Sequence, residues 1–169
     1  KPPTKHENYN DAILNYCNKR SISKATLDYV GVKRNFNNKD GNSVCFEYRN
    51  ELGEHLCNKY RFTSKNANPK MKFEEGTNVN TLFNMDKVNI SEPLLITEGE
   101  FDCLSFETVG ANCMALCSAN NTSKFIKQDK DVNKTYILAL DNDEAGKLAS
   151  DELSKYFEEN NINYCFFYN

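Results

Sequence analysis

Four acidic residues lie directly after two short apolar runs, at spacings that suit metal chemistry. Glu98 follows the run Leu-Leu-Ile-Thr and Asp102 comes one helical turn later, while Asp141 and Asp143 follow the run Tyr-Ile-Leu-Ala-Leu. Hard divalent cations take oxygen ligands, and carboxylates from two segments can supply them while water and phosphate fill the remaining positions. The four acids therefore indicate a site for Mg²⁺ or Mn²⁺.

A second explanation accounts for several acids without a metal. Acidic side chains in the first turn of a helix stabilise the helix dipole, and this role fits Glu100, Asp102, Asp143 and Glu144. It does not account for Glu98 and Asp141, which stand at the strand ends and are followed by Gly99 and by the small pair Ala145-Gly146. The combination favours the metal site.

Alternating apolar and amphipathic segments in residues 92–169 would place these acids at one edge of a sheet. Continuous apolar runs predict strands, and helical periodicity predicts helices between them. Such units form a mainly parallel sheet flanked by helices and buried on both faces, with its working groups beyond the carboxyl ends of the strands. We expect strands over 94–97, 113–116, 136–140 and 164–167, and helices over 101–108, 123–128 and 144–159.

Residues 1–91 have a different pattern, which predicts an α+β lobe with an antiparallel meander. Helical spacing predicts a first helix over 9–19, and Ser23 and Gly31 suit the ends of a second. Alternating apolar residues then predict strands, with a hairpin turn at Asp40-Gly41. The strands expected are 32–36, 44–49 and 56–62, and 63–80 is expected to be a loop anchored by Met71 and Phe73. The fold class is therefore α/β, with two lobes, 1–91 and 92–169.

Composition limits the class of protein and its compartment. The net charge of −3 combines a basic half, 1–91, at +5 with an acidic half, 92–169, at −8, as expected if one lobe held phosphates and the other metal ions. Drift in surface composition would also explain this split. Seven cysteines without a CxxC pair predict reduced thiols in a cytoplasmic protein. No apolar run approaches the roughly 18–20 residues of a membrane helix.

The strand-tip acids resemble a known family. Glu98-Gly99 after a strand, followed later by Asp141-x-Asp143 and Ala145-Gly146, is similar to the Toprim domain of primases, type IA and type II topoisomerases and some nucleases. Three upstream motifs follow in the order seen in the primase-helicases of tailed phages, whose relatives include the mitochondrial replicative helicase and many prophage primases. These motifs are Asn58-Lys59-Tyr60-Arg61, Lys72-Phe73 and Thr81-Leu82-Phe83-Asn84.

This resemblance implies a function and a role for each matching residue. It implies a DNA primase core that joins ribonucleoside triphosphates on a single-stranded DNA template, in bacterial cytoplasm or a phage-infected host. Glu98 would bind metal or act as acid or base at the primer 3′-hydroxyl, and Asp141 and Asp143 would bind Mg²⁺ or Mn²⁺. Asp102 matches a further family acid. In the other lobe, Lys59, Arg61 and Lys72 would contact nucleotide phosphates and the DNA backbone, with exposed side chains; without the resemblance they would form a solvated strand face.

The family also implies partners outside this chain. Its primases carry a zinc-binding module that reads the template, and no such cysteine pattern occurs here. They place a further acidic stretch beyond the position of Asn169, and a replicative helicase in fusions. We therefore expect both a zinc-binding module and a helicase as partners.

Two other functions remain open at this point. A Toprim nuclease would use the same acids without needing nucleotides, whereas a topoisomerase also needs a nucleophilic Tyr in a separate domain. A non-catalytic DNA-binding module of a replicative helicase would keep the fold and lose the acids first. Glu98, Asp141 and Asp143 are all present, which favours an enzyme.

Overall fold

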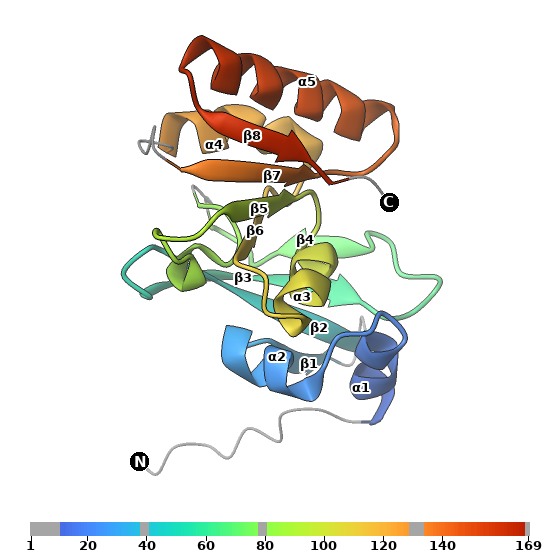
Figure 1. Cartoon of the computed structure of the whole chain (residues 1–169). Coiled ribbons are helices and arrows are strands. Elements are labelled where there is room, and N and C mark those ends of the chain that lie inside the picture. Colours follow the sequence, from blue (N-terminus) through green and yellow to red (C-terminus); the bar gives the residue numbers. More distant parts are fainter. Residues whose placement is uncertain (1–10, 38–40, 78–80, 129–133, 168–169) are drawn as a thin grey trace.

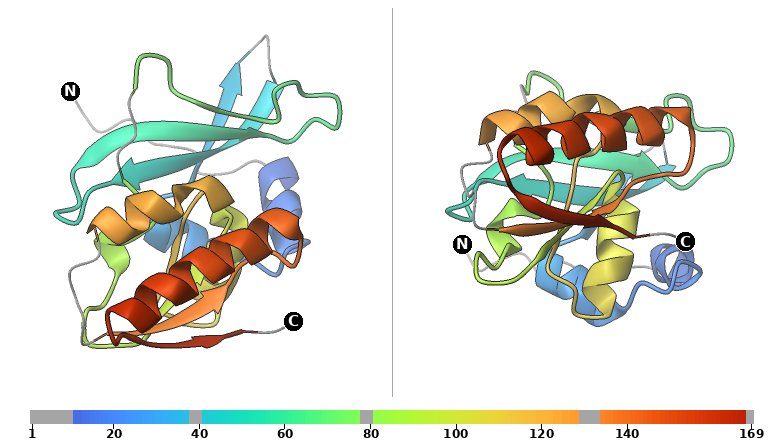
Figure 2. Two further views of the ribbon diagram at one scale, coloured as in Figure 1. Left: turned by 90° about the horizontal axis from the view of Figure 1, so that it is seen from above. Right: turned by 45° about the horizontal axis from the view of Figure 1, so that its top comes forward.

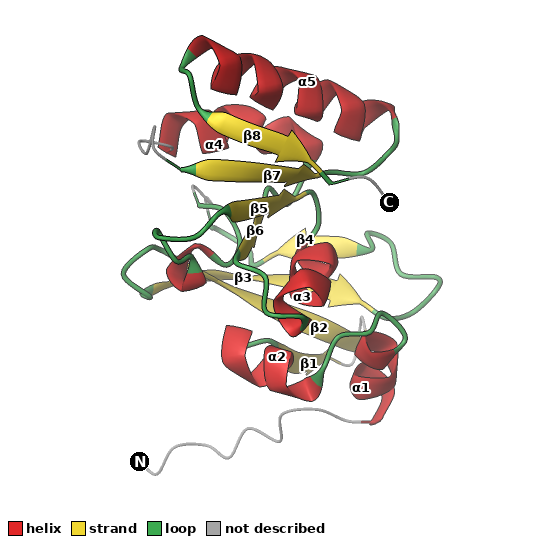
Figure 3. Cartoon of the chain, in the orientation of Figure 1, coloured by secondary structure: helices red, strands yellow, loops and turns green. Residues whose placement is uncertain are grey.

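Two four-stranded sheets follow one another along the chain, the first antiparallel and the second parallel (Figures 1 and 3). The computed structural model describes residues 11–37, 41–77, 81–128 and 134–167. The expected change of architecture between the two halves of the chain is confirmed.

The first lobe begins with two short helices that precede the antiparallel sheet. The Ser23 side chain accepts a hydrogen bond from the Thr26 backbone N–H at the start of the second helix, and Gly31 ends it in the left-handed region at φ 84°. Both caps agree with the sequence-based expectation. The elements are α1 (Asp11–Asn18), α2 (Lys24–Val30), β1 (Lys33–Asn37), β2 (Gly41–Arg49), β3 (His55–Phe62) and β4 (Met71–Phe73), with the strands paired in sequence order.

The strand β4 corrects one expectation. Residues 63–80 were expected to form a loop, yet Met71–Phe73 pairs with β3 as an antiparallel edge strand, with Lys59 opposite Phe73 and Arg61 opposite Met71. A three-residue strand is too short to show the alternation that would reveal it in the sequence. The expected turn at Asp40-Gly41 lies partly outside the described residues.

The second lobe is a parallel sheet of βαβ units, as expected. Its strands are β5 (Leu94–Thr97), β6 (Cys113–Ala115), β7 (Thr135–Ala139) and β8 (Asn163–Phe166), in the spatial order β6-β5-β7-β8. The α-helices between them are α3 (Glu100–Thr108), α4 (Thr122–Gln128) and α5 (Glu144–Glu159), and two 3₁₀ turns, η1 (Met85–Lys87) and η2 (Ala119–Asn121), complete the described elements.

Helices cover both faces of the parallel sheet (Figure 2). One face packs on α4 and α5, where Phe125, Leu153 and Phe157 lie in a single apolar cluster with strand residues. The other face packs on α3 and belongs to a second cluster that also contains Phe46 and Tyr48 of β2. The two lobes therefore share one core. Strands β5 and β6 are buried throughout, whereas the edge strand β8 is largely exposed, contrary to the expected burial on both faces.

The segment between the lobes is attached to the parallel sheet by the fourth motif residue of the Thr81–Asn84 segment and its neighbour. Phe83 pairs with Ala115 of β6 as an isolated antiparallel bridge. Asn84 adopts a positive φ of 67°, and its Nδ2 donates to the carbonyl of Cys113. This segment therefore closes the free edge of β6.

Cysteines and helix lengths agree with the compositional expectations. All seven thiols are free; five are buried, Cys117 is half-buried and Cys165 is exposed. Within the described part of the chain, no helix has both the length and the apolar character needed to cross a membrane.

Candidate functional site

The parallel pairing of β5 and β7 brings the predicted acids to one edge. Thr97 is in register with Ala139 at the carboxyl ends of the two neighbouring strands. Glu98 is the first residue after β5, and Asp141 is the second after β7. Adjacent parallel strands point their carboxyl ends the same way, so the two acids leave the sheet on the same side.

Glu98 has the marks of a carboxylate held ready for a ligand. Its Oε2 atom is buried and has no hydrogen-bond partner. Burial raises the pKa of Glu98, the negative charges of Asp141 and Asp143 raise it further, and hydrogen bonding by the backbone amides of Ala119 and Asp141 opposes the rise. The three carboxylates therefore interact electrostatically, as the sequence predicted.

Asp102 contributes to the same cluster of charge and also supports its own helix. It lies at the surface, three residues after the Gly99 N-cap, and its carboxylate folds back so that a Cβ on Gly99 would lie 2.7 Å from Oδ2. Partial burial and the charge of Asp141 raise the pKa of Asp102, while hydrogen bonds from the backbone amides of Asp102 and Gly99 lower it. The metal and helix-capping explanations thus both apply to this residue.

Asp143 and Gly146 fix the turn that carries Asp141. Asp143 is the N-cap of α5, and its Oδ1 accepts a hydrogen bond from Gly146 N–H at 2.9 Å. A Cβ at Gly146 would lie 2.0 Å from the carbonyl oxygen of Asp141, so only glycine fits there. One oxygen of Asp143 is thereby occupied, and the close approach explains the small pair at 145–146.

These residues fit a hydrated divalent cation better than a dry protein cage. In the described residues, no three His, Cys, Asp or Glu side chains are arranged to hold an ion by themselves. Mg²⁺ usually keeps several waters and takes one or two carboxylates together with substrate phosphates. An unpartnered Glu98 oxygen beside two more carboxylates supplies that kind of site.

A cavity of about 570 Å³ opens beside the acids. Asp102 and Asp141 line it, together with Lys147 of α5 and the aromatic rings of Phe106 and Phe167. The two rings are in edge-to-face contact, with centroids 5.2 Å apart. The acidic edge therefore borders a volume large enough for a small ligand.

The expected exposure of Lys59 is wrong. This residue is 5% exposed, and its ammonium forms an ion pair with Glu100 Oε1 at 2.5 Å. The pairing of β2 and β3 places Lys59 opposite Phe46, on the face that packs against the second lobe. An uncompensated ammonium cannot be buried at such a position, so a carboxylate from α3 meets it.

The other two predicted basic residues lie on opposite faces of the antiparallel sheet. Arg61 is half-buried on the same face as Lys59, and its Nε has no hydrogen-bond partner. Lys72 pairs with Tyr60 and therefore points to the other face, where its ammonium lies 5.3 Å from the Phe62 ring. The three residues do not form one basic surface.

Sequence reasoning missed a buried polar network between the lobes. Glu100, which had been explained by the helix dipole, is 4% exposed and accepts hydrogen bonds from Lys59 and, at 2.6 Å, from the Tyr48 hydroxyl. That hydroxyl is also hydrogen-bonded to Cys117 Sγ at 2.7 Å. The strand alternation offered a signal, because Cys57 and Lys59 occupy the same face.

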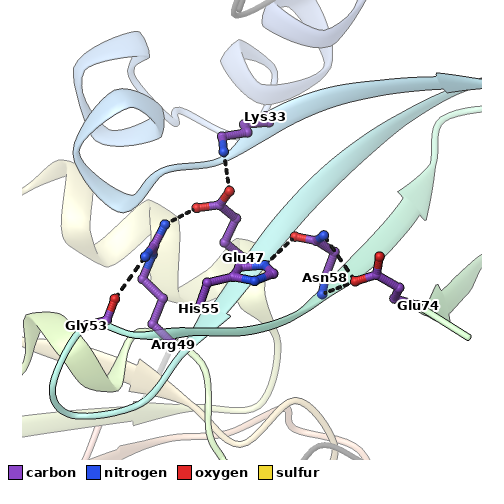
Figure 4. A network of polar contacts seen from close by, with 7 residues as sticks. All are labelled: Lys33, Glu47, Arg49, Gly53, His55, Asn58 and Glu74. Atoms are coloured by element: carbon purple, nitrogen blue, oxygen red, sulfur yellow. Dashed lines mark hydrogen bonds and ion pairs between the residues drawn. The ribbon is translucent and has the colours of Figure 1, made fainter. Parts of the chain in front are cut away.

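The outer face of the antiparallel sheet carries a separate polar network (Figure 4). Glu47 forms ion pairs with Lys33 and Arg49, and these partners lower its pKa against the opposing effect of burial. Asn58 joins His55 to Glu74 through side-chain hydrogen bonds. These charges are paired with one another and are directed away from the acidic edge.

Comparisons with known proteins agree on the architecture. Residues 95–167 match the family described as Toprim-like. The zinc-binding and RNA polymerase domains of Aquifex aeolicus primase align with a TM-score of 0.72 at 15% identity, over 95% of this chain and 50% of that one. The primase fragment of the bacteriophage T7 primase-helicase aligns with a TM-score of 0.70 at 22% identity, over 89% and 62%. A DnaG primase catalytic domain bound to single-stranded DNA aligns at 0.64 and 16%, over 94% and 64%.

The fold is that of a Toprim primase core. The chain spans half to about two thirds of these three structures. No curated protein matched it by sequence. In this primase-core fold the acidic edge belongs to the Toprim-like part, and the buried Lys59 comes from the preceding lobe.

Replacing Gly146 of the primase core should disrupt the turn at Asp141. In Gly146→Ala the new Cβ would collide with the Asp141 backbone, which cannot rotate away as a side chain would. We expect a loss of about 2–4 kcal/mol in the free energy of unfolding, measured by urea denaturation. The neighbouring exposed Ala145→Ser is the control and should change it by less than about 0.5 kcal/mol. A fully stable Gly146→Ala protein would contradict this geometry.

Removing the charge of Asp141 should stabilise the metal-free primase core at neutral pH. Asp141 raises the pKa of both Glu98 and Asp102, so the folded protein binds protons more tightly than the unfolded chain, and stability falls as pH rises above about 4. Asp141→Asn should therefore gain roughly 0.5–1 kcal/mol at pH 7, a gain that disappears below about pH 4.

Thermal unfolding across this pH range, without metal, measures the effect. The exposed Glu75→Gln in the other lobe is the control and should show no such dependence. Saturating Mg²⁺ should raise the melting temperature of the unaltered chain more than that of Asp141→Asn. A gain that persists at low pH would show that charge repulsion is not its cause.

Proposed function

We propose that this chain is the catalytic core of a DNA primase that makes short RNA primers on single-stranded DNA by two-metal nucleotidyl transfer. One observation carries the proposal: a buried, unpartnered Glu98 oxygen lies at the edge where Asp141 and Asp143 converge electrostatically, in a chain with a primase-core fold. A surface cluster of acids that only capped helices would leave no such oxygen.

Glu98 is suited to accept the proton of the attacking hydroxyl. The reaction forms a bond between the 3′-oxygen of one ribonucleotide and the α-phosphorus of the next, and breaks the bond to pyrophosphate, which leaves. The displaced hydroxyl proton needs a base, and the raised pKa of Glu98 brings it closer to neutral pH, where a general base works best. Its free Oε2 supplies the acceptor atom.

Asp141 and Asp143 would share metal binding with Glu98. Bound Mg²⁺ or Mn²⁺ supplies charge neutralisation for the triphosphate and lowers the pKa of the attacking hydroxyl. Asp143 orients its carboxylate through its N-cap hydrogen bond to Gly146, and Asp141 stands on the turn that Gly146 makes possible. Asp102 adds negative charge at the rim of the adjoining cavity.

Arg61 and Lys72 are proposed to contact phosphates, and Lys59 is not. The Lys59 ammonium is buried against Glu100, whereas Arg61 has an unpartnered Nε on the face that meets the second lobe. Lys72 would contact nucleic acid on the other face of the sheet. Binding of single-stranded DNA by the related DnaG catalytic domain supports this substrate for the present chain.

The partners of the whole protein are part of the same proposal. The T7 relative is a primase-helicase and the Aquifex relative carries a zinc-binding domain. We propose that this core works with a replicative helicase and a zinc-binding template reader, within a phage-type primase-helicase or a prophage primase. The lobes 1–91 and 92–169 would be its basic and Toprim parts.

Primer synthesis with labelled ribonucleotides tests the function directly. With single-stranded DNA and Mn²⁺ or Mg²⁺, the chain should form short RNA products, and Glu98→Gln should reduce the rate at least about 100-fold because the proton acceptor is lost. The exposed Glu92→Gln, near the start of β5, is the matched control and should retain the rate. Cleavage of DNA by metal alone, without nucleotide incorporation, would identify a nuclease and overturn the proposal.

The contribution of Arg61 can be measured through salt dependence. Arg61→Ala should weaken binding of single-stranded DNA and lower the slope of log affinity against log salt by about one unit, as expected for one lost phosphate contact. Lys19→Ala, an exposed change beside α1, should leave the slope unchanged. Fluorescence anisotropy at several salt concentrations gives both slopes, and an unchanged Arg61→Ala slope would remove Arg61 from the binding surface.

A further inference from the structure

The buried network between the lobes surrounds the backbone that carries Glu98. Glu100 is the second residue after Glu98, and its carboxylate is held by Lys59 and Tyr48 from the antiparallel sheet. On the other side, Cys117 donates its backbone N–H to the Glu98 carbonyl at 2.8 Å. The Tyr48 hydroxyl contacts both of these flanking residues.

The backbone at Cys117 needs this support. Its φ is 70°, an unfavourable conformation for a residue with a Cβ. Cys117 nevertheless keeps its amide directed at Glu98, while its sulfur is tied to Tyr48. Contacts from the first lobe thus accompany a strained conformation beside the strand-tip acid.

The protonation states of the network favour a fixed arrangement. Burial raises the pKa of Tyr48 far above its usual range, and the neighbouring Cys117 and Glu100 raise it further. Burial also raises the pKa of the Cys117 thiol to about 12. Both groups therefore stay protonated at neutral pH, which keeps the Tyr48 proton available to Glu100.

Stability alone does not explain a buried ion pair. Removing two charges from water is costly, and well-packed apolar residues of similar volume are often as stabilising or more so. Lys59 and Glu100 are almost fully buried, at 5% and 4% exposed. What the polar pair adds over an apolar one is a directed bond that fixes where Glu100, and hence the turn before it, lies.

We propose that Lys59 and Tyr48 are positioning residues for Glu98: they hold Glu100 and Cys117, which flank and hydrogen-bond the Glu98 peptide. Neither residue touches substrate. This inference rests on the proposed function only in taking Glu98 as the catalytic and metal-binding acid, since the hydrogen bonds themselves are independent of it.

The double variant Lys59→Met/Glu100→Leu tests the inference without leaving a buried charge unpaired. Both substitutions approximately keep side-chain volume, and Tyr48 retains its contact to Cys117, so the protein should fold with undiminished stability. The matched control is Lys24→Met/Asp28→Leu, which removes an ion pair of the same 2.5 Å length from the exposed surface of α2.

Three measurements on the full chain report on positioning. Hydrogen exchange at the Cys117 amide should accelerate about tenfold in the double variant, while the Leu116 amide, bonded to the Thr97 carbonyl, stays within about threefold. Mn²⁺ affinity, measured by electron paramagnetic resonance, should fall about tenfold. In primer synthesis, kcat should fall at least about tenfold, with KM for nucleotide within about threefold.

The inference is supported only if the double variant folds with faster Cys117 exchange and weaker Mn²⁺ binding while the control shows neither. Any other pattern in the folded double variant, or failure of the double variant alone to fold, overturns it. If the unaltered chain binds Mn²⁺ but makes no primers, the proposed primase function fails, and the exchange and metal measurements still decide the positioning role.

Discussion

Two opposite charges that are withdrawn from water together dominate the organisation of this chain. Lys59 belongs to the antiparallel sheet and Glu100 to the helix that follows the first strand of the parallel sheet. Neither charge can remain buried without the other, because an unpaired buried ion costs several kcal/mol. The apolar core shared by the lobes must therefore close with α3 in one register, and that register also sets the place of the acidic edge.

The acidic edge itself is an arrangement that repels its own members. Burial and like charge raise the pKa of Glu98 and Asp102, so the carboxylates are held together against their electrostatic preference. The backbone holds them there: glycine permits the close approach at Gly146, and Cys117 accepts a positive φ. Unfavourable conformations and unfavourable charges thus gather at one edge, as expected where a cation is to be bound.

The sequence predicted the elements well because each carries a local signal. The apolar run at 94–97 and the caps Ser23 and Gly31 lie where expected. The fates of polar residues were less accessible: Asp143 combines a cap with a strand-tip acid, and Lys59 is buried. Alternation placed Lys59 on the apolar face, but its burial depended on a carboxylate from a distant segment, and no local pattern reveals such a partner. The three-residue β4 was missed for the related reason that an edge strand is defined by its neighbour.

The position of Glu98 therefore depends on both halves of the chain. Tyr48 and Lys59 come from the first half, and Glu100 and Cys117 from the second. An isolated parallel domain would keep its strands and its acids, yet it would expose the apolar face that now packs on β2 and would leave Glu100 without its cation. The basic lobe thus has a structural task that comes before any contact with nucleic acid: it supplies the one cation that the acidic lobe needs in its interior. The charge asymmetry seen in the sequence is expressed inside the protein as well as on its surface.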